Sequence, residues 1–280
     1  MITWAVRLGV EMRALILIAL LLFLNHAAAA ADCPALSETG SPLLNTPAHV
    51  TQVCHAGYTA LHDDDLLIPR WVAYRLTSLH SMGCLKPFAE FHAEDILPPG
   101  RRAEPTDYRR SGFDRGHQAP AEDFAWDLQE EQDSFSMVNA VPQLPGLNRE
   151  GWEYLEQTVR AWAWTRGAVV VFAGPILTPQ PPTIGDDRVA VPIAFFKVVY
   201  DPQTEEAIAF LMPQRYVTKG DLSRWITSVA DIQERTGITF PLPRHIDIAS
   251  KSPLWPADIP GWRRAHRQEC TAEKQLLRQQ

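Results

Sequence analysis

Hydrophobic residues recur with a helical period in the segment from Leu147 to Trp164, just after the turn formers Pro145-Gly146. Spacings of three and four predict a helix with one apolar face, and Asn148 fits its N-cap position. The apolar positions of this helix are Trp152, Leu155, Val159 and Trp162.

Shorter apolar or alternating runs predict strands at 71–76, 168–172, 194–200 and 207–211. Gly174-Pro175 is expected to end the second strand, and Asp201-Pro202 opens a turn that indicates an antiparallel pair. A second helix is predicted over 221–237, capped by Asp221 and ended by Gly237. Because strands and helices mix without strict alternation, we expect one α+β domain with a mainly antiparallel sheet flanked by helices.

The composition is that of a globular protein, with 280 residues, 46% hydrophobic and 21% charged. These values exclude a disordered, collagen-like or coiled-coil chain. With 26 basic and 33 acidic residues the net charge is −7. That charge argues against a surface coated by nucleic acid, although a local basic groove remains compatible with it.

Residues 1–31 have the pattern of a signal peptide. Arg7 and Arg13 precede an apolar run over 14–24, which is too short to span ~30 Å of hydrocarbon, and small residues follow at 27–31. We expect cleavage and export to the periplasm or the medium, without stable membrane association; an uncleaved anchor is the alternative. We further expect an irregular N-terminal wrap at 32–66, a main domain at 67–250 and a C-terminal tail at 251–280.

Four cysteines lie beyond this segment: Cys33, Cys54, Cys84 and Cys270. In an oxidising compartment they predict two disulfides, and three pairings are possible. We favour Cys33–Cys54, with Cys84–Cys270 holding the tail.

Candidate chemistry concentrates at Asp114-Arg115-Gly116-His117. This stretch offers a base, a phosphate ligand and a carboxylate around a glycine that permits an unusual backbone angle. Four more arginines lie just upstream: Arg101, Arg102, Arg109 and Arg110. In an acidic protein, this density of arginines predicts an anion-binding groove.

The wider sequence strengthens this interpretation. Residues 111–123 read SGFDRGHQAPAED, and further blocks follow at 136–143, 147–149, 173–176 and 191–197. Together they resemble the DNA/RNA non-specific endonucleases, the family that includes mitochondrial endonuclease G. The matching order over roughly residues 70–240 is more specific than one short motif.

The resemblance implies a ββα-metal active-site motif and an endonuclease that hydrolyses DNA or RNA with little sequence specificity, using Mg²⁺ or alternatively Mn²⁺. It implies His117 as general base, Arg115 on phosphate, Asn148 as direct metal ligand and Glu156 on metal-bound waters. The supporting residues that it implies are Asp114, Asn139, Gln143 and Trp152.

Helix geometry is compatible with these roles. Asn148 and Glu156 are eight residues apart, or ~80° around an α-helix, and Trp152 lies ~40° from each. Both polar side chains could therefore face one cleft.

The chain departs from the family pattern in one place. An arginine that the family has upstream, next to an aromatic residue, is missing from 86–92; Lys86 or the pair Arg101-Arg102 could substitute, although lysine lacks the bidentate fork. Two alternatives therefore stay open: a nucleic-acid-binding protein without catalysis, and a phosphodiesterase of the same fold with a different substrate. An inhibitor protein as partner is a further expectation.

Overall fold

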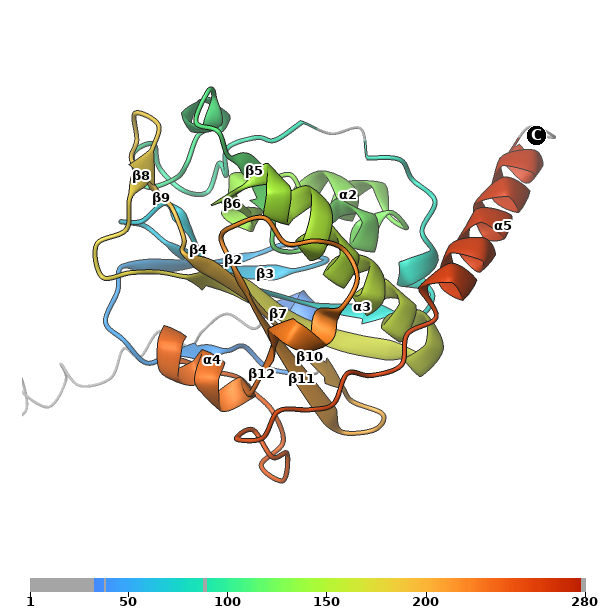
Figure 1. Cartoon of the computed structure of the whole chain (residues 1–280). Helices are drawn as coiled ribbons and strands as arrows, with labels where there is room; N and C mark the ends of the chain where they lie inside the picture. Colours follow the sequence, from blue (N-terminus) through green and yellow to red (C-terminus); the bar gives the residue numbers. More distant parts are fainter. Residues whose placement is uncertain (1–32, 38, 88–89, 278–280) are drawn as a thin grey trace, which may run out of the picture. The chain divides into compact units, whose positions relative to one another are not determined.

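A seven-stranded sheet lies at the centre of the structure, a computed structural model that describes residues 33–37, 39–87 and 90–277 (Figure 1). Its strand order is β12-β11-β10-β7-β4-β3-β2, and every neighbouring pair is antiparallel. The predicted α+β fold is therefore confirmed. The strands are β2 (Val50–Cys54), β3 (Thr59–Asp63), β4 (Ile68–Thr77), β7 (Ala168–Ile176), β10 (Ala194–Asp201), β11 (Glu206–Pro213) and β12 (Ile226–Thr227).

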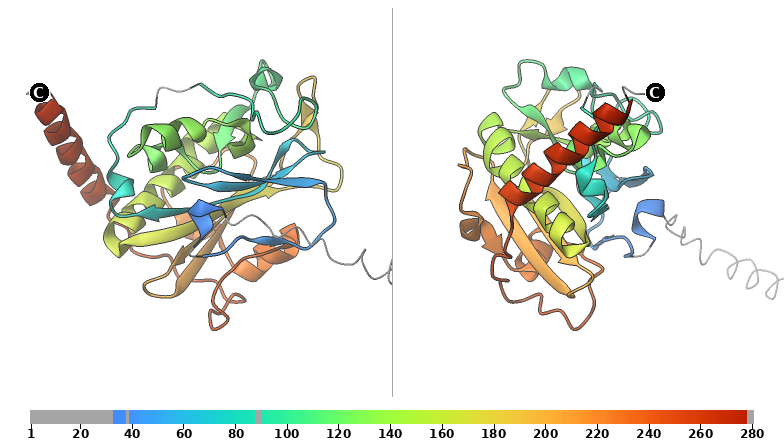
Figure 2. Two further views of the ribbon diagram at one scale, coloured as in Figure 1. Left: turned by 180° about the vertical axis from the view of Figure 1, so that it is seen from behind. Right: turned by 90° about the vertical axis from the view of Figure 1, so that its right-hand side faces the viewer.

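Both faces of this sheet are buried. In β4, Val72 and Tyr74 join the core beneath α3 (Glu153–Arg166), whereas Trp71 and Ala73 join the core beneath α4 (Val229–Thr236). The two helices cover opposite faces, as the turned views show (Figure 2). Burying each large side chain contributes roughly 1.5–3 kcal/mol, so two continuous cores hold the sheet rigidly.

The helix predicted after Pro145-Gly146 is confirmed, and its four apolar positions are fully buried. It begins, however, with a π-helical turn over Leu147–Trp152, and its N-cap is Gly146. Asn148 therefore lies inside the first turn, and the expectation that it caps the helix is wrong. A π turn within an α-helix often accompanies a functional site.

The helix predicted over 221–237 is broken into two pieces. Residues 222–225 form a 3-10 turn that Asp221 caps, strand β12 pairs with β11, and Ser228 caps a new helix, α4. Pairing across the sheet thus overrides a continuous helical pattern. Gly237 ends α4 as predicted, with a left-handed φ of 67°.

Strand β7 does not end at Gly174-Pro175 but continues to Ile176. Proline has no backbone N–H to donate to a neighbouring strand. It is tolerated here because the pairing of β7 with β4 ends at Ala173, so no donor towards β4 is needed at Pro175.

The N-terminal region is more regular than expected. Strands β2 and β3 belong to the central sheet, so the prediction of an irregular wrap is wrong from Val50 onward. The stretch lacks a clear sequence period because β3 is buried on both faces. The predicted signal peptide lies outside the described residues.

The rest of the described residues add three two-stranded sheets and two α-helices, besides short 3-10 turns. Within the described ranges, no helix is both long and apolar enough to cross a membrane. These elements are β5 (Asp114–His117) with β6 (Ala140–Gln143), β8 (Thr183–Ile184) with β9 (Val189–Ala190), β1 (Leu43–Leu44) with β13 (Ile238–Thr239), α2 (Leu128–Asp133) and α5 (Ile259–Leu277).

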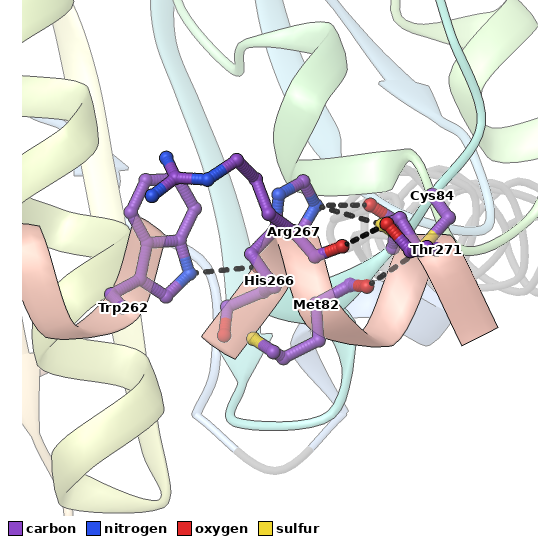
Figure 3. Close-up of a disulfide and its surroundings, with 9 residues drawn as sticks. Met82, Cys84, Trp262, His266, Arg267 and Thr271 are labelled. Carbon is purple, nitrogen blue, oxygen red and sulfur yellow. Dashed lines mark hydrogen bonds between the residues drawn. A yellow bond between two sulfur atoms is a disulfide. The ribbon is translucent and has the colours of Figure 1, made fainter. Parts of the chain in front are cut away.

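Two disulfides join Cys33 to Cys54 and Cys84 to Cys270, which is the pairing we favoured. The second fixes α5 to the segment after β4, and Figure 3 shows the side chains around it. Beside the bond, Nε2 of His266 lies 2.8 Å from the carbonyl oxygen of Gly83. The C-terminal tail is therefore a helix that is covalently attached to the main domain.

The two disulfides should differ in their contribution to stability. A crosslink stabilises mainly by restricting the unfolded chain, and the separations are 186 and 21 residues. We expect the double variant Cys84→Ser/Cys270→Ser to lose about 5 kcal/mol of unfolding free energy, and Cys33→Ser/Cys54→Ser about 3 kcal/mol. Urea denaturation of both variants checks the order, and equal losses would contradict it.

Candidate active site

A small ββα unit carries the sequence motif. Strand β5 pairs with β6, opposing Asp114 to Gln143 and His117 to Ala140, and the chain then enters α3. Gly116 does not have the unusual backbone angle that we expected, because its φ is not positive. It must be glycine for another reason: a Cβ there would overlap the side chain of Gln143.

His117, at the end of β5, is enclosed by aromatic rings. Its ring centroid lies 4.7 Å from that of Phe91 and 5.0 Å from that of Phe135. Burial lowers the pKa of His117 from 6.5 to about 4, although the carboxylate of Glu122 opposes the shift. The imidazole is therefore neutral at physiological pH and can accept a proton.

Arg115 shares the Phe91 ring with His117. Its guanidinium carbon lies 5.6 Å from the Phe91 centroid and 5.7 Å from that of Tyr108, and Nη2 donates to the carbonyl oxygen of Pro105 at 2.6 Å. Two rings and one carbonyl fix the guanidinium, while its Nε is buried without a partner. A guanidinium oriented in this way is suited to bind an anion.

Asp114 holds Asn148 in place. The carboxylate accepts a hydrogen bond from Asn148 Nδ2 at 3.0 Å and two from Arg149, at 2.8 and 2.6 Å. Burial alone would raise the pKa of Asp114, but these hydrogen bonds outweigh it and lower the pKa. Because the amide nitrogen is committed to Asp114, the amide oxygen is the atom left to bind a cation.

Glu156 lies two turns further along the same helix and is only 8% exposed. Burial raises the pKa of Glu156, and the positive charges of Lys197 and Arg160 oppose the shift. Its carboxylate accepts no hydrogen bond from any described residue. Since each residue of a π turn rotates less than one of an α turn, the separation from Asn148 is smaller than the ~80° of an ideal helix.

Asn139 and Gln143 differ in how their amides are used. Both side chains are fully buried. Asn139 donates to the carbonyl oxygens of Ala119 and Ser134 at 2.7 and 2.8 Å and accepts from the Ala119 N–H at 2.8 Å, which fixes the chain just after His117. The amide of Gln143 has no partner.

Unpartnered buried polar atoms gather on the ββα unit. Buried polar groups are normally hydrogen-bonded, so such a concentration indicates a place where water, ion or substrate completes the network. The atoms are His117 Nε2, Arg115 Nε, Gln118 Oε1, Gln143 Nε2 and Oε1, and Trp152 Nε1.

The predicted substrate-binding cations fall into two groups. Arg101 is paired with Asp65 while its side chain stays half-exposed, and Arg102 bonds Glu104 and nearby carbonyl oxygens. The others have exposed side chains that make no hydrogen bond or ion pair with another described residue: Lys86, Arg109 and Arg110.

Sequence analysis missed the aromatic and charged residues that surround the motif. Phe91 and Phe135 lie far from His117 in sequence, and no spacing rule connects them. Beneath Glu156, Asp123 accepts hydrogen bonds from Tyr74 and Arg160, at 2.7 and 2.8 Å. The one available signal was a charged residue inside the apolar β10 pattern, Lys197.

Comparison with known proteins identifies the family. The family model for DNA/RNA non-specific endonuclease matches residues 37–243. The chain belongs to this family. It is 33% identical to the mitochondrial endonuclease G of Bos taurus over 54% of the chain and 55% of that protein. It is 32% identical to nuclease C1 of Cunninghamella echinulata var. echinulata, over 56% of the chain and 68% of the relative.

A solved structure of an EndoG/EndoGI complex is also similar, with a TM-score of 0.65 and 27% identity. The match covers 70% of this chain and 87% of that one. The chain spans about half the length of the endonuclease G relatives that it matches.

The depressed pKa of His117 can be tested directly. We expect the ring signal that disappears in His117→Gln to titrate with a midpoint near 4 in the metal-free protein, because burial disfavours the imidazolium. Proton NMR of the histidine rings between pH 3 and 8 measures this midpoint. The neutral imidazole stabilises the fold above the unfolded pKa of ~6.5, and that stability is lost as pH falls towards 4. A titration midpoint near 6.5 would contradict burial of the His117 ring.

Proposed function

We propose that the protein is an exported, Mg²⁺-dependent endonuclease that hydrolyses phosphodiester bonds of DNA and RNA with little sequence specificity. One observation carries this proposal: a neutral imidazole and an oriented guanidinium share the Phe91 ring at one end of a ββα unit. The helix of the same unit presents an amide oxygen and an unbonded carboxylate. Family membership supports the reaction class.

The chemistry of the imidazole follows from its surroundings. The imidazole of His117 makes no hydrogen bond to a described residue, and its buried Nε2 has no partner, so the ring is free to bind a water. As general base, His117 takes a proton from the water that attacks phosphorus. The bond from phosphorus to the 3′ oxygen then breaks and leaves a 5′ phosphate. Arg115 holds the non-bridging oxygens during this step.

The donor atoms on the helix fit a magnesium ion. Mg²⁺ prefers oxygen ligands and retains most of its waters. Asn148 would supply a direct oxygen ligand, and Glu156, whose lone pairs are not used by the protein, would accept hydrogen bonds from the surrounding waters. When bound, the ion would supply Lewis-acid stabilisation of the phosphate and the departing oxygen.

Low sequence specificity follows from the kinds of group present. Arg115 and the exposed Arg109 and Arg110 suit phosphate contacts, and such contacts carry no base information. Among the predicted cations, Arg101 and Arg102 are already paired, so we assign the missing upstream arginine to neither.

Export and inhibition extend the same proposal. Two disulfides support a protein that works in an oxidising compartment, since such bonds persist there. A structural relative is described in complex with an inhibitor, EndoGI, which motivates a search for an inhibitor of this protein.

The general base provides the main test. We expect His117→Ala to cut supercoiled plasmid and RNA ~10²–10⁴-fold more slowly at saturating Mg²⁺ because the proton acceptor is lost. Gel assays under single-turnover conditions measure the rate. The control is His245→Ala, which removes an exposed histidine that pairs with Glu205. Cutting at the native rate by His117→Ala would refute the assignment.

The same assays separate the alternatives. A catalytically inactive binding protein would retard DNA in a gel without cutting it, even in the native sequence. A phosphodiesterase with another substrate would hydrolyse a small diester such as bis(p-nitrophenyl) phosphate but leave plasmid and RNA intact.

Asp114 should act on the ion through Asn148. We expect Asp114→Ala to weaken Mn²⁺ binding about 10–100-fold, because the amide of Asn148 is then free to rotate. Arg149→Ala is the matched control: it removes a partner of the same carboxylate but retains the bond to Asn148. Paramagnetic resonance of free Mn²⁺ measures both affinities, and equal losses in the two variants would contradict the assigned role.

A further inference from the structure

Lys197 is a fully buried cation on β10, on the face of the sheet beneath α3. Its Nζ lies 4.7 Å from the ring centroid of Trp152, 3.4 Å from the carbonyl oxygen of Gln118 and 4.0 Å from Oε1 of Glu156. Burying an ammonium group is costly unless charge and hydrogen bonds compensate. A lysine at this position therefore needs a reason beyond packing.

The charges around Glu156 identify its partner. Two cations act on this carboxylate, Lys197 and Arg160, and two acids, Glu122 and Asp123. Arg160 already donates a hydrogen bond to Asp123 at 2.8 Å. The ammonium of Lys197 is therefore the cation left to balance Glu156.

The distance between Lys197 and Glu156 is itself informative. A second pair joins the same helix and strand, where the half-buried Arg166 donates to the buried Asp201 at 2.5 Å. That pair is a closed, structural salt bridge. At 4.0 Å, Lys197 supplies a balancing charge without a hydrogen bond, so the lone pairs of Glu156 stay available to other donors.

We propose that Lys197 is a positioning residue that holds Glu156 in place while leaving its carboxylate oxygens open to the waters of the bound metal ion. The inference rests on the proposed function, because it assumes that the carboxylate serves a cation. Without Lys197, the carboxylate would rotate towards another donor, and the ion would be bound less tightly.

A double-mutant cycle tests the proposal, with Mn²⁺ alone as the probe. We expect Lys197→Met and Glu156→Gln each to weaken Mn²⁺ binding about tenfold, as loss of an outer-shell group commonly does. The double variant should bind no more weakly than Glu156→Gln, since Lys197 acts only through that carboxylate. Native affinity in Lys197→Met, or fully additive losses, would overturn the proposal.

Matched variants separate this role from a structural one. Arg166→Met breaks the other pair between α3 and β10 and should lower the thermal unfolding midpoint without changing Mn²⁺ affinity. A change in Mn²⁺ affinity as large as that of Lys197→Met would overturn the proposal. Lys197→Gln replaces the methionine variant if that protein does not fold, and the same criteria apply.

The same variants distinguish failure of the proposed metal site from failure of the role assigned to Lys197. If Glu156→Gln binds Mn²⁺ as the native protein does, the carboxylate serves no ion and the proposed metal site is wrong. If Glu156→Gln weakens binding but Lys197→Met does not, only the role of Lys197 is wrong.

Discussion

The packing of α3 on the central sheet is the constraint on which the rest of the structure depends. Its apolar stripe is fully buried against β4, β7 and β10, so the helix cannot rotate about its axis or slide along it without opening the core. The same helix carries Glu156, and the π turn before it carries Asn148. Packing of apolar side chains thus determines where two polar site residues point.

Electrostatics adds a second layer beneath this packing. Lys197, Glu156, Arg160 and Asp123 are buried together, which a hydrophobic core normally excludes. Breaking such a network leaves an uncompensated charge, whereas replacing a whole pair by apolar residues often costs nothing. The presence of these charges under the site is therefore better explained by function than by stability.

The sequence could predict those features that local patterns encode. The stripe on α3, the pair β10–β11 and the stop at Gly237 follow from spacing and turn chemistry. Features decided by tertiary contacts could not be predicted. Strand β12 interrupts a helical pattern because β11 offers it hydrogen bonds, and the stretch before β4 had no visible period although it contains three strands.

The candidate site shows the same division. Short motifs located Asp114, His117 and Asn148, but Phe91 and Phe135 reach the imidazole only through the fold. Charge density was a poorer guide, because Arg101 and Arg102 are already paired with Asp65 and Glu104. Gly116 was expected for its backbone freedom, whereas the structure requires it for close approach to Gln143.

The bond between Cys84 and Cys270 also sets an order of events during biosynthesis. Every proposed catalytic residue, from Arg115 to Glu156, lies between these two cysteines. The ring can close only after Cys270 has left the ribosome and entered an oxidising environment. A nascent or reduced chain therefore carries the whole motif before α5 is locked in place, so closure of this bond is a separate and late step in the maturation of the enzyme.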